Sequence, residues 1–163
     1  MSGKLIIRTI TAASVFLFII AVADSANAQR RREARGRGMT KAQVKAVIDR
    51  VEDRVDNFVK NYDKSLDRSR LNGSDREDWL NKRARDLESA TDELSREFQR
   101  RDAWIENQDE VRRCLNIATD LDRNMRNYRL RAATEGNWTR VRFELNTLAD
   151  IYNLPKVGAK TYR

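Results

Sequence analysis

Carboxylates are the side chains best placed for acid–base chemistry in this chain of 163 residues, which contains no histidine. Asp120 and Asp122 are close in sequence, as are Glu52 and Asp53. Both pairs fall on the solvent-facing sides of expected helices, where a carboxylate is a hydrated charge and not a general acid. Without histidine, most zinc sites, haem sites and Glu-x-x-His di-iron sites are excluded. We therefore expect a protein that is not an enzyme, with no catalytic residue, metal or cofactor. Carboxylate pairs that face inward would instead favour an enzyme of unfamiliar type.

The single cysteine, Cys114, cannot form a disulfide bond within the chain. One interpretation is a small buried residue on a helix, and this is the one we expect. The other is a disulfide bond between two copies of an exported protein.

Aromatic residues form a second group with a possible binding role. The directions of the expected helices place Trp79, Tyr128 and Trp138 at one end of the molecule, with Tyr62 near them, and Trp104 at the other end. A cluster of rings could hold a small apolar or glycan ligand. The simpler interpretation, which we favour, is that large rings fill the widening end of a helical bundle.

Arginines dominate the segment 29–38, which reads QRRREARGRG and carries a net charge of +4. This segment resembles a flexible basic linker and could contact an anionic surface weakly, at about 1 kcal/mol per residue or less. A solvated linker is the alternative. Its lack of aromatic residues does not favour base stacking, so we expect no specific nucleic-acid binding. The basic residues are Arg30, Arg31, Arg32, Arg35 and Arg37.

The net charge of +8 lies almost entirely at the ends of the chain. Residues 155–163 read as a basic C-terminal tail with three more positive charges, whereas residues 39–154 carry no net charge. A basic face on the folded region, typical of nucleic-acid binding proteins, is therefore not indicated.

Residues 1–28 have the three parts of a secretory signal peptide. Lys4 and Arg8 precede an apolar run from residue 10 to 23, and Ala26 and Ala28 then provide the small side chains that signal peptidase needs before Gln29. The apolar run is shorter than the ~20 residues of a transmembrane helix, although an uncleaved anchor is the alternative. No second apolar run follows, so we expect a periplasmic or extracellular protein that is not transmembrane after cleavage.

Apolar residues recur at spacings of three and four through most of the chain after residue 39, which is typical of amphipathic helices. We expect helices over 40–69, 74–102, 107–131 and 137–153. Thr40, Ser74 and Asn107 are the expected N-caps, and the fourth helix is expected to start at Gly136-Asn137. The predicted fold is all-α, an up-down-up-down antiparallel four-helix bundle spanning 39–154.

Several short patterns resemble a group of small exported bacterial proteins that carry a signal peptide and one helical bundle. They are the run from 66 to 74, Glu77-Asp78, the pattern from 88 to 94, the segments 111–118 and 117–125, and the pattern from 138 to 152. The resemblance implies a bacterial source and an all-α bundle, and it implies no activity. We therefore expect an envelope-associated binding or scaffolding module with an unidentified protein or envelope partner. The alternative is a carrier of a small ligand at the Trp79/Trp138 end.

Overall fold

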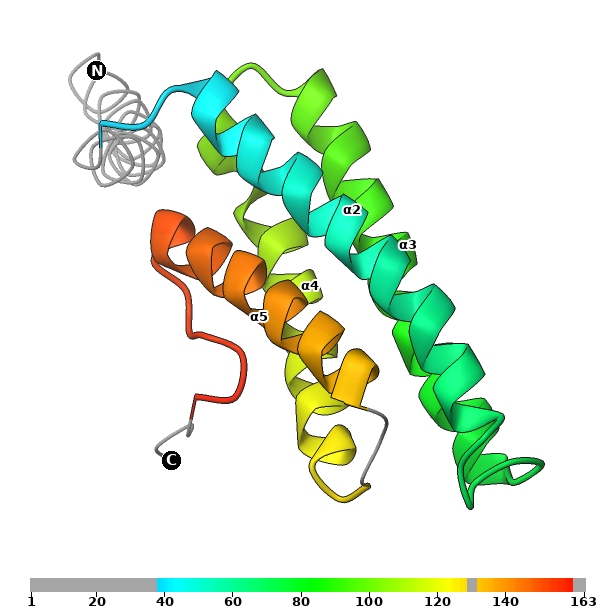
Figure 1. Cartoon of the computed structure of the whole chain (residues 1–163). Helices are drawn as coiled ribbons and strands as arrows, with labels where there is room; N and C mark the ends of the chain where they lie inside the picture. The colour runs from blue at the N-terminus through cyan, green and yellow to red at the C-terminus, as the bar shows by residue number, and fades with distance from the viewer. Residues whose placement is uncertain (1–37, 129–131, 160–163) are drawn as a thin grey trace, which may run out of the picture. The chain divides into compact units, whose positions relative to one another are not determined.

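The computed structural model describes residues 38–128 and 132–159. The chain divides into two compact units, Met1–Gly38 and Met39–Arg163, and every described helix belongs to the second unit (Figure 1). The expected signal peptide, its cleavage residues Ala26, Ala28 and Gln29, and the arginines from 30 to 37 lie outside the described residues.

Four α-helices lie in the described part of the second unit, and the prediction of an all-α fold is confirmed for the described residues, which contain no strand. They are α2 (Lys41–Leu66), α3 (Asp75–Arg100), α4 (Gln108–Met125) and α5 (Ala132–Tyr152), with a short 3₁₀ helix, η1 (Trp104–Asn107), before α4. None of these helices has an apolar stretch long enough to cross a bilayer.

The first two helices begin at the residues that the sequence indicates. Thr40 caps α2: its Oγ1 accepts from the Gln43 amide at 3.2 Å, and Gln43 Oε1 accepts from the Thr40 amide at 2.8 Å. Ser74 caps α3 by accepting from the Glu77 amide at 3.2 Å. Glu77 Oε2 accepts from the amide of Gly73 at 2.6 Å, one residue earlier than in a standard capping box.

The boundaries of α4 and α5 differ from the prediction. Asn107 makes no side-chain cap, because η1 precedes α4 and the side-chain Nδ2 of Asn107 donates to the Trp104 carbonyl at 3.2 Å instead. The helix α4 ends at Met125, and α5 already begins at Ala132, so Gly136 lies inside α5. A glycine in a helix costs about 1 kcal/mol relative to alanine, and the burial of Thr134 and Trp138 on either side offsets it.

Each helix packs against two others: α2 against α3 and α5, and α4 against the same two helices (Figure 1). The apolar stripes meet in one core, whose largest fully buried side chains come from all four helices. Each such side chain contributes about 1.5–3 kcal/mol on burial. They are Ile48, Phe58, Tyr62, Leu66, Leu80, Leu87, Leu94, Phe98, Leu121, Leu145, Leu148 and Tyr152.

The chain turns back on the helices after α5, although we expected a separate tail from residue 155. Asn153 adopts a positive φ of 54°, and the Leu154 amide donates to the Ala149 carbonyl at 2.8 Å, which closes the helix with a Schellman motif. Val157 is buried, and its amide donates to Asn146 Oδ1 at 2.8 Å. Residues 153–159, here called the C-terminal segment, therefore pack on the helices because Val157 adds apolar surface to the core.

Candidate functional site

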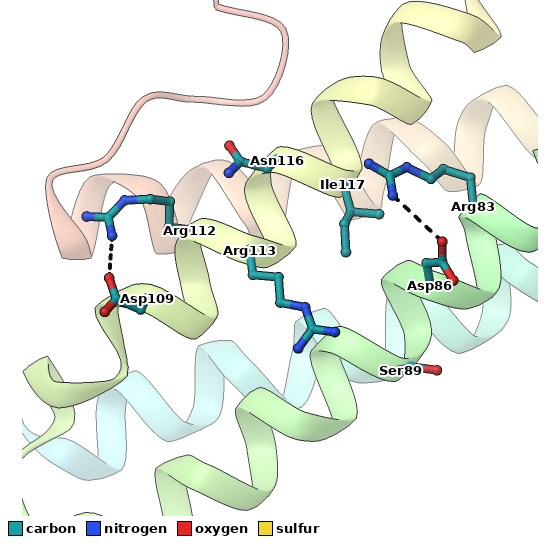
Figure 2. Close-up of a pocket in the computed structure, with 8 residues that line it drawn as sticks. All are labelled: Arg83, Asp86, Ser89, Asp109, Arg112, Arg113, Asn116 and Ile117. Atoms are coloured by element: carbon teal, nitrogen blue, oxygen red, sulfur yellow. Dashed lines mark hydrogen bonds and ion pairs between the residues drawn. The ribbon is translucent and has the colours of Figure 1, made fainter.

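The outer face of α4 lies between two hollows. The first, here called the α3–α4 groove, has a volume of about 570 Å³ and is shown in Figure 2. Its lining comes from two helices and consists mostly of charged and polar side chains: Arg83, Asp86 and Ser89 of α3, and Asp109, Arg112, Arg113, Asn116 and Ile117 of α4.

Helical spacing explains why these side chains share one groove. Positions 109, 112, 113, 116 and 117 follow the i, i+3, i+4, i+7, i+8 pattern, so they lie on one face of α4. The same rule places Arg83 and Asp86 together on α3. Ile117 is 7% exposed and gives the groove an apolar floor between the charged walls.

Each arginine of the groove already has a carboxylate partner. Arg113 reaches across to Glu93 of α3 at 2.6 Å. Arg83 pairs with Asp120 and lies 3.7 Å from Asp86, and Arg112 pairs with Asp109.

A guanidinium has five N–H donors, so donors remain for a partner after these ion pairs form. The Nε of Arg83 is buried and has no hydrogen-bond partner among the described residues. The groove therefore presents alternating donors and acceptors of both charges, which suits binding and includes no nucleophile paired with a base.

The second hollow, here called the C-terminal slot, lies between α4 and the C-terminal segment and has a volume of about 340 Å³. It shares Arg112 and Asn116 with the α3–α4 groove, so these two residues form the ridge between the hollows. The rest of its lining is Leu115 and Thr119 of α4 and Leu154, Pro155, Lys156 and Ala159 of the segment.

The aromatic residues that the sequence singles out do lie near one another. The Phe58 ring stands 4.9 Å from Tyr62 and 5.0 Å from Trp138, measured between centroids. The guanidinium of Arg76 lies 4.6 Å from the centroid of Trp79, and its Nε donates to the Tyr128 hydroxyl at 3.2 Å.

These rings differ in how far they are available to a ligand. Trp138 is 5% exposed and packs in the core, whereas Trp79 is 38% exposed. Neither hollow beside α4 includes Trp79, Tyr128 or Trp138 in its lining. At the other end, Trp104 packs edge-on against Tyr152 at 5.3 Å.

Asp122 corrects the prediction that the paired carboxylates face solvent. Its side chain is 3% exposed, whereas that of Asp120 is 44% exposed. Asp122 Oδ1 accepts from Trp138 Nε1 at 2.9 Å and from Arg142 Nη1 at 3.1 Å, and Oδ2 accepts from Arg126 Nε at 3.1 Å. This carboxylate is fully used in joining α4 to α5 and is no candidate for catalysis.

Burial and hydrogen bonding act in opposite directions on the pKa of Asp122. Burial raises this pKa. The hydrogen bonds from Trp138, Arg126 and Arg142 and the charge of Arg126 lower it by more than burial raises it, so the pKa of the carboxyl lies below its ordinary range. Burial raises the pKa of Tyr62 and of Tyr152, both in the core.

Two further pKa shifts lie outside the hollows. Burial, followed by the charges of Asp56 and Asp92, raises the pKa of Glu88. Cys114 is wholly buried, as the first interpretation of this residue expects, and burial raises the pKa of its thiol to about 12. A buried, protonated thiol is a poor partner for a disulfide bond.

Within residues 38–128 and 132–159, no group of three or more acidic or thiol side chains is arranged to hold a metal ion. Comparison of the chain with models of known protein families, with curated proteins and with solved structures finds no match.

The groove residues were not singled out from the sequence because exposed charges occur on every helix. Two signals in α4 point to them in retrospect. Arg112 and Arg113 are adjacent and stand three and four residues after Asp109, so helical spacing gathers these charged side chains on one face of α4 (Figure 2). Ile117 is an apolar residue beside the main stripe of α4, which indicates a second buried edge.

Proposed function

We propose that the protein is an exported bacterial module with up-down-up-down bundle topology that binds or scaffolds a partner in the cell envelope and catalyses no reaction. The α3–α4 groove carries this proposal. It is the larger of the two hollows beside α4, and its walls are ion pairs that leave N–H donors available. We propose that its partner is a polypeptide segment with charges of both signs, because the groove itself offers both.

A charge reversal in the groove tests this function. The exported protein is tagged, crosslinked in cells and purified with its partner. Arg113→Glu puts a carboxylate against Glu93 and removes a donor, so we expect this variant to recover no crosslinked partner. Arg54→Glu is the matched control, since Arg54 is exposed on α2 and takes part in no ion pair among the described residues. Equal recovery of one partner with both variants would contradict a role for the groove.

Export rests on the sequence of residues 1–28, and it has its own test. We propose that signal peptidase cleaves after Ala28, which leaves Gln29 and the basic linker as the new N-terminus. Mass measurement of the protein recovered from periplasm or medium should give a chain that begins at Gln29. Recovery of the intact chain in the membrane fraction would support an uncleaved anchor instead.

The second candidate function is a carrier of a small apolar or glycan ligand at the aromatic end. The observation in its favour is the Tyr62 hydroxyl, which is buried beside Phe58 and has no hydrogen-bond partner among the described residues. A ligand hydroxyl could satisfy it. Titration with envelope lipids and glycans should then change tryptophan fluorescence in wild type and less so in Tyr62→Phe, and a flat response across the panel would remove the candidate.

A further inference from the structure

The C-terminal slot differs from the α3–α4 groove in chemistry, although the two share a ridge. Its apolar lining residues are Leu115, Leu154, Pro155 and Ala159. Arg112 and Lys156 are its two cationic lining residues, and none of its lining residues is acidic. An apolar lining with two cations and no carboxylate complements a ligand that has an apolar body and one negative charge.

The slot is held in shape before any ligand arrives. The Schellman motif fixes Leu154 at one end of the C-terminal segment, and Val157 is buried and hydrogen-bonded in its middle. Near its far end, Gly158 has a φ of 76°, and a Cβ there would lie only 2.8 Å from Asp122 Oδ2. The hydrogen bonds of Leu154 and Val157 and the burial of Val157 hold this wall in place, and a preformed site lowers the entropic cost of binding.

The polar side chains of the slot can still form ion pairs and hydrogen bonds with a ligand. Arg112 pairs with Asp109, which is 84% exposed, and Lys156 pairs with Asp150 at 2.9 Å, which is 58% exposed. Surface pairs of this kind are weak, at about 0–1 kcal/mol. The side-chain amide of Asn116 makes no hydrogen bond among the described residues, so it can donate to a carboxylate.

We propose that the C-terminal slot binds an amphiphilic monocarboxylate, such as a short fatty acid, with its chain on Leu115 and Leu154 and its carboxylate between Arg112 and Lys156. The volume of about 340 Å³ lies at the lower end of the range for small-molecule sites. The proposal is independent of the partner in the α3–α4 groove, although a ligand that engages Arg112 touches the shared ridge.

Three probes of matched structure separate the parts of this proposal. Octanoate has the chain and the charge, octanol has the chain alone, and acetate has the charge alone. The protein is expressed from the full chain and purified. We expect octanoate to shift the backbone amide NMR signals of residues 154 and 156–159 in a saturable way. Octanol should bind about tenfold more weakly, and acetate should give no saturable shift. Equal binding of octanoate and octanol, or no saturable shift with octanoate, would overturn the proposal.

A pair of charge-neutralising variants locates the site. Arg112→Gln with Lys156→Gln should weaken octanoate binding about tenfold, because two surface charge contacts are lost. Arg54→Gln with Lys64→Gln changes the net charge equally on the exposed face of α2 and should bind octanoate as wild type does. Both variants alter exposed side chains, and unchanged thermal unfolding verifies that they fold. Equal weakening in both would show attraction to net charge alone and would overturn the site.

Discussion

Replacement of Asp122 by asparagine removes the charge at the centre of the contact between α4 and α5. The buried hydrogen bond from Trp138 to a charged acceptor contributes about 1.5–3 kcal/mol. Arg126 and Arg142 are 61% and 39% exposed and can turn to solvent, so their bonds are valued as surface pairs at about 0.5–1 kcal/mol each. Asparagine keeps one acceptor oxygen, and we therefore expect Asp122→Asn to lower the free energy of unfolding by about 2–3 kcal/mol.

Urea unfolding at neutral pH, followed by tryptophan fluorescence, measures this loss through the linear dependence of the unfolding free energy on urea. Asp49→Asn is the matched control, because Asp49 is 47% exposed and pairs with Lys45 within α2. We expect the control to change stability by about 0.5 kcal/mol or less. Equal losses in Asp122→Asn and Asp49→Asn would refute the reasoning.

The pH dependence of the free energy of unfolding provides a second test of Asp122→Asn. Because the pKa of Asp122 is lower in the folded protein than in the unfolded chain, the carboxylate stabilises the fold above the unfolded pKa of about 3.9. That contribution is lost as the pH falls through the lower, folded pKa. The stability difference between wild type and Asp122→Asn should be constant above about pH 5 and shrink below about pH 4. A difference that grows on acidification would contradict the direction of the shift.

Three further predictions concern other elements. Gly158→Ala should lower the free energy of unfolding in urea by about 2 kcal/mol, because the new Cβ combines a positive φ with a close approach to Asp122. Gly73→Ala is the control: it has a similar φ in open space and should lower that free energy by about 1 kcal/mol. Equal losses would show that the approach to Asp122 adds nothing. Thr40→Ala should lower stability by about 1 kcal/mol through loss of the α2 cap, and an unchanged urea midpoint would contradict that role. Cys114 should resist iodoacetamide at pH 8 in the folded protein and react in urea, since its pKa is raised to about 12; alkylation of the folded protein would contradict its burial.

The helices were predictable because their signals are local. The apolar stripe of α2 and the caps at Thr40 and Ser74 depend on residues within a few positions of one another, and the structure has them where the sequence indicates. The start of α5 was not predictable from Gly136, because the buried contacts of Trp138 come from other helices and outweigh the low helix propensity of glycine.

The hollows and the role of Asp122 depend on how distant segments pack. Asp122 is next in sequence to an exposed charge, and only the approach of Trp138 and Arg142 from α5 buries it. The C-terminal slot needs a chain reversal after α5 that Val157 and Asn146 fix together. Neither contact leaves a periodic signal in the sequence, so pattern analysis places both segments in solvent.

Position-specific crosslinking tests most directly whether the α3–α4 groove is the binding surface. A photoreactive residue at Ser89 lies in the groove, and one at Asn57 lies on the exposed face of α2. In cells that export the protein, we predict a discrete crosslinked product from position 89 that is absent from position 57. A product of the same size and yield from both positions, or from position 57 alone, would contradict the account.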